Sequence, residues 1–167
     1  AMHIPDAYDD YKHASGRIIP GIDCYRAVCA HAAAHIMETR VAFKGDDLNP
    51  LQVACISLIE DLRVELNTLK KFPGMKKTWI ALHPEDEDLK DLNPFIVDLV
   101  DFSRAAWDQK YTVKQSFNSD FLKLFIKKMT KMPESSAMSY ELGMNYYELL
   151  KTETDVKISA SALVSTP

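Results

Sequence analysis

The chain has 167 residues, of which 47% are hydrophobic, and a formal net charge of -4 at pH 7. This is enough apolar material for one ordinary domain with a sizeable core. Because acidic and basic residues are interleaved along the chain, the composition argues against a nucleic-acid-binding surface. The five glycines form neither a dinucleotide-binding nor a triphosphate-binding loop, so we expect no nucleotide cofactor.

The apolar runs and the cysteines indicate the compartment. The longest apolar run is far shorter than the roughly 20 residues that cross a bilayer, so we expect no membrane span. The three cysteines, Cys24, Cys29 and Cys55, lie in apolar helical patterns, which favours reduced buried thiols over disulfides. We therefore expect a cytoplasmic protein.

The first half of the chain predicts two long helices. Residues 1–20 are expected to be an N-terminal extension. Apolar residues recur at spacings of three and four over residues 22–40, which predicts the first helix. Asn49 and Pro50 supply an N-cap and a first-turn proline for a second helix, which should end at Pro73. The following segment, to residue 92, is interpreted as a connector that contains either a short helical turn or an extended piece.

The second half predicts three more helices. Asn93 and Pro94 repeat the start signal for a third helix, and Asn118 or Ser119 is expected to cap a fourth. A fifth should run from residue 136 to residue 150, followed by a flexible linker. Apolar and small polar residues alternate over residues 111–113 and 156–164, but such short alternation is weak evidence for strands. We predict an all-α bundle of five to six helices over residues 21–152, with residues 153–167 as a tail toward a missing C-terminal region.

The stretch HAAAH places His31 and His35 four residues apart, on one face of the first helix, where two imidazoles can bind one cation. Ala32 stands where the HExxH motif has its glutamate, and spacing fixes no third ligand. The metal hypothesis therefore adds an acid from the second helix, Glu60, and would make the chain a metal-dependent hydrolase or a metal-delivery module.

The stretch IEDLRVE favours a structural explanation of the same histidines. Its charged residues follow a nearly unbroken apolar run, and charge in such a setting is costly unless it is paired. Glu60 can pair with Arg63 along the helix, while Asp61 and Glu65 can accept hydrogen bonds from the histidines or from Arg26. We call the predicted set the polar seam: His31, His35, Glu60, Asp61, Arg63 and Glu65.

Two other stretches receive simpler interpretations. Asp101 and Ser103 match part of the DxSxS metal loop of a von Willebrand A domain, but Ala105 replaces its second serine. The exposed charges after the second helix are interpreted as solvated loops that offer a candidate docking surface for a charged partner. These residues are Lys76, Lys77, Glu85, Asp86, Glu87 and Asp88.

Three stretches in succession carry a family resemblance: CYRAVCAHAAAH, LNPLQVACISLIEDLRVE and KKFPGMKKTWIALHP. Together they resemble the N-terminal region of the CbbO and NorD proteins, the large von Willebrand A partners of MoxR-type AAA+ ATPases. The similarity covers residues 21–84, and IEDLRVE followed by FPG is its most specific part.

The resemblance implies a non-catalytic adaptor domain without a cofactor. Family members couple a hexameric ATPase to a client, which is Rubisco for the CbbO branch and nitric oxide reductase for the NorD branch. The metal-binding motif of the family lies in its von Willebrand A domain, which is absent from this sequence. No catalytic residue is therefore carried over, and the polar seam corresponds only to the motif of the family's helical region.

Overall fold

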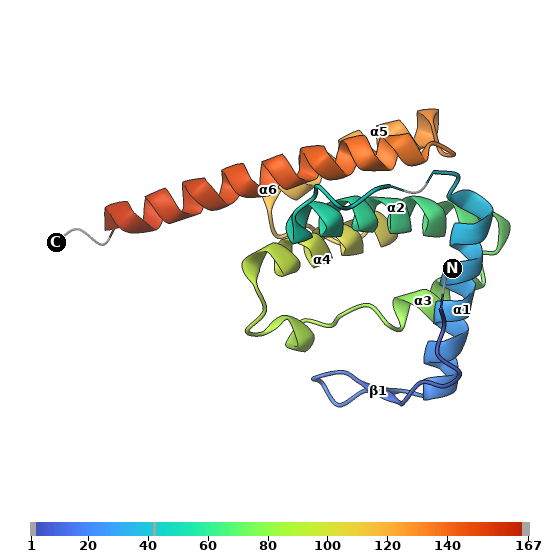
Figure 1. Ribbon diagram of the computed structural model, residues 1–167. Coiled ribbons are helices and arrows are strands. Elements are labelled where there is room, and N and C mark those ends of the chain that lie inside the picture. Colours follow the sequence, from blue (N-terminus) through green and yellow to red (C-terminus); the bar gives the residue numbers. More distant parts are fainter. Residues whose placement is uncertain (1–2, 42, 165–167) are drawn as a thin grey trace.

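The computed structural model describes residues 3–41 and 43–164, with side chains as far as residue 154. This part of the chain forms an all-α bundle with one very small sheet, as the sequence predicts (Figure 1). The elements are β1 (Tyr11–Lys12), β2 (Ile18–Ile19), α1 (Gly21–Glu38), α2 (Pro50–Lys71), α3 (Met75–Ile80), the 3-10 turn η1 (Glu87–Leu89), α4 (Pro94–Trp107), α5 (Ser116–Lys131) and α6 (Ser136–Val164). Among the described residues, no helix combines the length and apolar character that crossing a membrane requires.

The helix α2 is the centre of the bundle. It packs along α6, its most extensive contact, and also contacts α1 and α4. Gly143 of α6 lies directly against α2, because a Cβ at this position would come within 2.5 Å of the Cα of Ile56. Tyr146 and Leu150 continue this buried face of α6 toward the core. The close approach at Gly143 lets the two longest helices exclude water along their shared face.

The starts of α2 and α4 follow the predicted capping signals. Asn49 and Gln52 form a capping box at the start of α2, with Pro50 in the first turn. The Asn93 side chain accepts a hydrogen bond from the Phe95 amide at the start of α4. Both helices therefore begin where an Asn-Pro pair satisfies their unpaired amide groups.

The structure corrects the predicted start of the fourth helix. The helix α5 begins at Ser116, so neither Asn118 nor Ser119 is its cap. Asn118 is instead fully buried, and its side-chain amide donates to the Asp98 carbonyl and to the Asp101 carboxylate. A buried amide inside the helix, with partners on α4, replaces the expected cap.

The last helix runs into the predicted C-terminal tail. The helix α6 continues to Val164, so the alternation at residues 156–164 is part of a helix. Figure 1 shows this final portion extending beyond the rest of the bundle. Residues 165–167, the end of the predicted linker, lie outside the described residues. The expected connector contains α3 and η1, and residues 111–113 lie in a loop.

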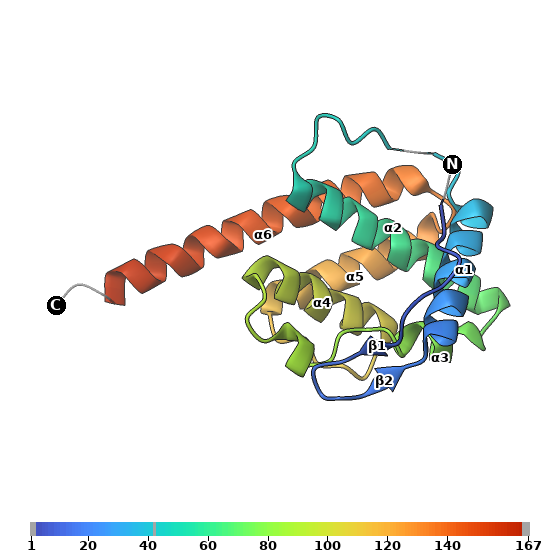
Figure 2. The ribbon, with the colours of Figure 1, turned by 60° about the horizontal axis from the view of Figure 1, so that its bottom comes forward.

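The predicted N-terminal extension folds back onto the bundle. The strands β1 and β2 form a two-stranded antiparallel hairpin, with Tyr11 opposite Ile19, and Figure 2 shows this hairpin beside α1 and α3. The turn contains Gly16 at φ 92°, a conformation that suits glycine. The Asp10 carboxylate accepts a hydrogen bond from the Gly21 amide at 2.8 Å, so the extension caps the first turn of α1.

Candidate functional site

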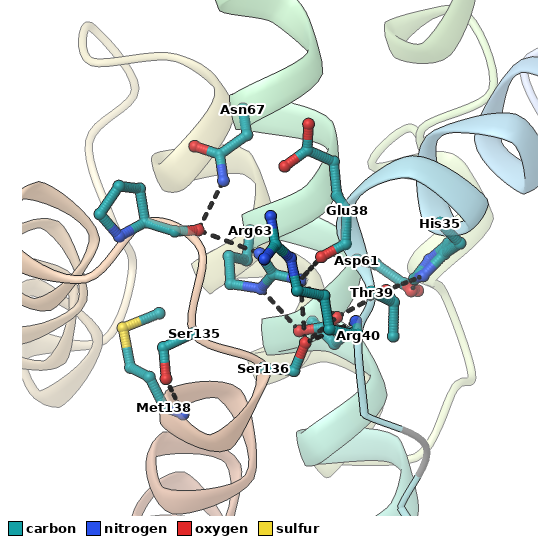
Figure 3. Close-up of polar contacts among 12 residues, drawn as sticks. His35, Glu38, Thr39, Arg40, Asp61, Arg63, Asn67, Ser135, Ser136 and Met138 are labelled. Carbon is teal, nitrogen blue, oxygen red and sulfur yellow. Dashed lines mark hydrogen bonds and ion pairs between the residues drawn. The ribbon is translucent and has the colours of Figure 1, made fainter.

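Arg63 is the most buried member of the polar seam. Its side chain has 0% exposure, and it makes a bidentate pair with Glu60, at 2.8 Å from Nε to Oε2 and 2.6 Å from Nη2 to Oε1. The guanidinium also donates to the Glu38 carbonyl at 2.9 Å and to the Pro133 carbonyl at 3.0 Å (Figure 3). One side chain of α2 thereby provides hydrogen bonds to backbone carbonyls at the end of α1 and in the turn between α5 and α6.

Glu60 is held as a carboxylate in this buried setting. Burial alone would raise its pKa, but hydrogen bonds from Arg63 and Thr39 outweigh that effect and hold the pKa below its usual value. Thr39 donates its hydroxyl to Glu60 Oε1 at 2.7 Å, and Ser136 donates to the same oxygen at 3.3 Å. We call Glu60, Arg63, Thr39 and Ser136 the Arg63 network.

Beside the Arg63 network lies the histidine cluster, which we define as His31, His35, Asp61 and Glu65. His31 Nδ1 donates to Glu65 Oε1 at 2.9 Å, and His35 Nε2 lies 3.0 Å from Asp61 Oδ1. His35 Nδ1 lies 2.9 Å from Thr39 Oγ1, which links the cluster to the Arg63 network. The hydrogen bond to Glu65 raises the pKa of His31 above its ordinary value, although partial burial acts in the opposite direction.

The structure brings all six residues of the polar seam together but divides them between these two groups. The acid that joins the histidines is Asp61, because Glu60 is occupied by Arg63. The predicted metal set of His31, His35 and Glu60 is therefore corrected to His31, His35 and Asp61. Arg26 takes no part in the seam and instead pairs with Asp23 one turn earlier on α1.

A small cavity adjoins the histidine cluster. It has a volume of about 200 Å³ and is lined by residues that include Glu65, Trp79 and His83. Burial, together with the charge of Arg104, lowers the pKa of His83 to about 4. His83 is therefore neutral near pH 7, and it packs against the Trp107 ring with centroids 5.1 Å apart.

The predicted docking surface is only partly free. Lys76 and Lys77 are exposed on α3. Three of the four acidic residues have partners within the chain, since Glu85 pairs with Arg17, Asp86 with Arg104, and Asp88 with His13. The acidic run therefore holds the N-terminal hairpin and α4 in place, and among its members Glu87 is the one without an assigned ion pair.

Asp101 has a structural role in place of the partial metal-loop match. Its carboxylate accepts hydrogen bonds from the Tyr111 hydroxyl, from the Lys114 and Gln115 amides, and from the Asn118 side chain. These bonds close the loop between α4 and α5 and satisfy amides at the start of α5. The carboxylate is fully occupied by donors from its own chain.

Sequence reasoning missed two groups that complete these clusters. Thr39 follows the last residue of α1 and connects His35 to Glu60. His13, at 1% exposure, lies in the segment interpreted as an extension and bonds Asp88, 75 residues away. Thr39 lies four residues after His35, but its contact with Glu60 and that of His13 with Asp88 depend on how distant segments meet in the fold, which no local spacing signals.

No family model, no curated protein and no solved structure matches this chain.

Proposed function

We propose that this chain is a non-catalytic helical adaptor domain that links a MoxR-type AAA+ ATPase to a client enzyme. The proposal rests first on the resemblance of residues 21–84 to the N-terminal region of the CbbO and NorD proteins. The observation that carries it furthest is the burial of Arg63 at the junction of three segments. The most specific motif of the resemblance thus supplies a scaffold, and Arg63 is out of reach of any substrate.

An exposed apolar surface supports a binding role. The last turn of α1 and the segment after it expose Ile36 to 76%, Met37 to 53% and Val41 to 52%. We call these three residues the α1 apolar surface. These three large apolar side chains are exposed within six residues of the chain, and exposed apolar residues that form a patch are typical of protein-binding sites. The α1 apolar surface immediately follows HAAAH. Arg63 fixes the adjoining end of α1 by donating to the Glu38 carbonyl.

The test is a pull-down of the cognate MoxR-type ATPase with the purified chain. We expect ATPase binding, and we expect Ile36→Asp combined with Met37→Asp to weaken it at least about tenfold, because buried apolar anchors dominate interface energies. Ile126→Asp on α5 is the matched control, since Ile126 is also 50% exposed but lies on a different helix. The control should bind like the wild type.

Parallel pull-downs with Rubisco and with nitric oxide reductase distinguish the two branches of the family. Binding of one client would assign the branch and place the client contact on this domain. If the chain binds neither the ATPase nor either client, the adaptor proposal is wrong.

A further inference from the structure

The histidine cluster brings three ligand atoms to one place between α1 and α2. They are Nε2 of His31, Nε2 of His35 and Oδ1 of Asp61, and all lie within 4.8 Å of one another. The Asp61 oxygen is 3.0 Å from the His35 nitrogen and 3.7 Å from the His31 nitrogen. Neighbouring ligands of a tetrahedral site are about 3.4 Å apart when metal–ligand distances are near 2.0–2.2 Å. Small side-chain rotations therefore suffice to bind one cation.

The hydrogen bonds around His35 fix which of its nitrogens carries a proton. The Thr39 hydroxyl has one proton, which it donates to the Glu60 carboxylate at 2.7 Å. Its oxygen must therefore accept from His35 Nδ1, which lies 2.9 Å away. A neutral His35 then has a lone pair on Nε2, and this lone pair faces the Asp61 oxygen. Two acceptors would meet there without a donor.

The same reasoning applies to His31. Glu65 is an acceptor, so the 2.9 Å contact requires a proton on His31 Nδ1. The lone pair of a neutral His31 is on Nε2, which faces the same Asp61 oxygen. Protonating His35 alone would give Asp61 one donor but leave the Nε2 lone pair of His31 facing the same oxygen at 3.7 Å. Protonating both rings would place two imidazolium cations with ring centroids 4.6 Å apart, where like charges repel.

One divalent cation satisfies all three acceptors at once. We propose that His31, His35 and Asp61 form a binding site for a single divalent cation of the zinc class. Two imidazoles and one carboxylate suit such metals, and three protein ligands leave a position for water or for a donor from a bound molecule. The Asp61 side chain is 42% exposed, so this position is accessible from solvent.

The surrounding residues match the outer shell of a metal site. Metal-binding histidines commonly donate their second ring nitrogen to a carboxylate or another acceptor, which fixes the ring and its tautomer. Glu65 supplies that acceptor for His31, and Thr39 supplies it for His35. Thr39 is in turn fixed by Glu60 and Arg63, so the buried network orients the ligand on α1.

This site does not depend on the adaptor proposal, and it is tested on the purified chain alone. Zinc is titrated at pH 7.5 in competition with a chromogenic chelator. We expect one equivalent to bind with a dissociation constant in the micromolar range or below. His35→Gln and Asp61→Asn should each weaken binding at least tenfold, and Glu65→Gln should weaken it by roughly 10 to 100-fold through the loss of the negative charge of the outer-shell carboxylate.

The control variant is His3→Gln, which removes an exposed histidine outside the cluster and should leave the zinc affinity unchanged. Circular dichroism checks the fold of each variant, and His31→Gln replaces any variant that does not fold. Zinc should also raise the melting temperature of the wild type but not that of Asp61→Asn. The proposal is overturned if the wild type binds zinc no tighter than about 100 μM, or if the ligand variants bind as well as the wild type.

Discussion

The histidine cluster and the N-terminal hairpin combine the same residue types with different results. In the hairpin, His13 Nδ1 donates to Asp88 at 2.6 Å, and its Nε2 accepts from Arg17 Nη2 at 2.9 Å. We call His13, Arg17, Glu85 and Asp88 the hairpin cluster. In the histidine cluster, both Nδ1 atoms donate and both Nε2 atoms face Asp61.

The two clusters differ in whether a permanently charged side chain of the protein, which we call the fixed cation, is part of the cluster. The Arg17 guanidinium supplies positive charge to the hairpin cluster and also pairs with Glu85 at 2.5 Å. Among the side chains that the structure describes, no arginine or lysine pairs with Asp61 or Glu65. Histidines and carboxylates in contact therefore do not by themselves indicate a metal site. What matters is whether the chain already provides the positive charge.

The largest expected effect is the loss of stability when Arg63, which fixes the network beside the histidine cluster, is replaced. Arg63→Met should lower the free energy of unfolding by about 3–5 kcal/mol, because Glu60 is left buried without its partner. The measurement is a urea unfolding curve. Lys70→Met is the control, since Lys70 lies on the same helix but is exposed, and it should cost less than about 0.5 kcal/mol. Equal effects of the two substitutions would contradict the central role of Arg63.

A smaller effect should follow from removing the cation of the hairpin cluster. Arg17→Met leaves His13, Glu85 and Asp88 close together, and their ligand atoms lie within 4.8 Å of one another. In a His35→Gln background, we expect this substitution to create a weak zinc site and to cost about 1 kcal/mol or less, because Arg17 is 43% exposed.

The control for this gain of binding is Lys12→Met, which removes an exposed positive charge from the same hairpin. Zinc titration should detect no new site in that variant. If Arg17→Met also gains none, the fixed cation is not what separates the two clusters.

The smallest expected effect is on the pH dependence of stability. In the metal-free protein, the contributions of Asp88 and His31 should change in opposite directions with pH. Hydrogen bonds from the Ala14 amide, His13 and the Glu85 amide lower the pKa of Asp88 from 3.8 to about 2. Its contribution to stability is present above pH 3.8 and is lost as the pH falls toward 2. The pKa of His31 is raised above 6.5, so its contribution is full below pH 6.5 and is lost as the pH rises through the folded-state pKa.

Nuclear magnetic resonance titration can measure both responses. Hydrogen exchange of the Ala14 amide, which donates to Asp88 at 2.6 Å, reports on the hairpin. The ring signals of His31 report on the histidine cluster, and Glu65→Gln should lower the pKa of His31, because the hydrogen bond to Glu65 is the largest cause of the shift. A His31 pKa that does not change in Glu65→Gln would contradict this assignment.

The sequence predicted the helices better than the partners of the charged residues. Capping by Asn49 and Asn93 is a local effect, so the starts of α2 and α4 could be located from adjacent residues. The choice between Glu60 and Asp61 as the histidines' partner depends on the rotation of α2 relative to α1, which no spacing within either helix determines. The hairpin was missed because its two strands have two residues each.

The glycine contact between α2 and α6 has a mechanical consequence. Gly143 lets α6 lie close against Ile56 of α2, and the buried face of α6 continues from there to Leu150. From Leu150 to Val164 the helix extends about 21 Å at 1.5 Å per residue. A bend of about 10° at Leu150 would move the far end by about 4 Å and leave the contact at Gly143 in place.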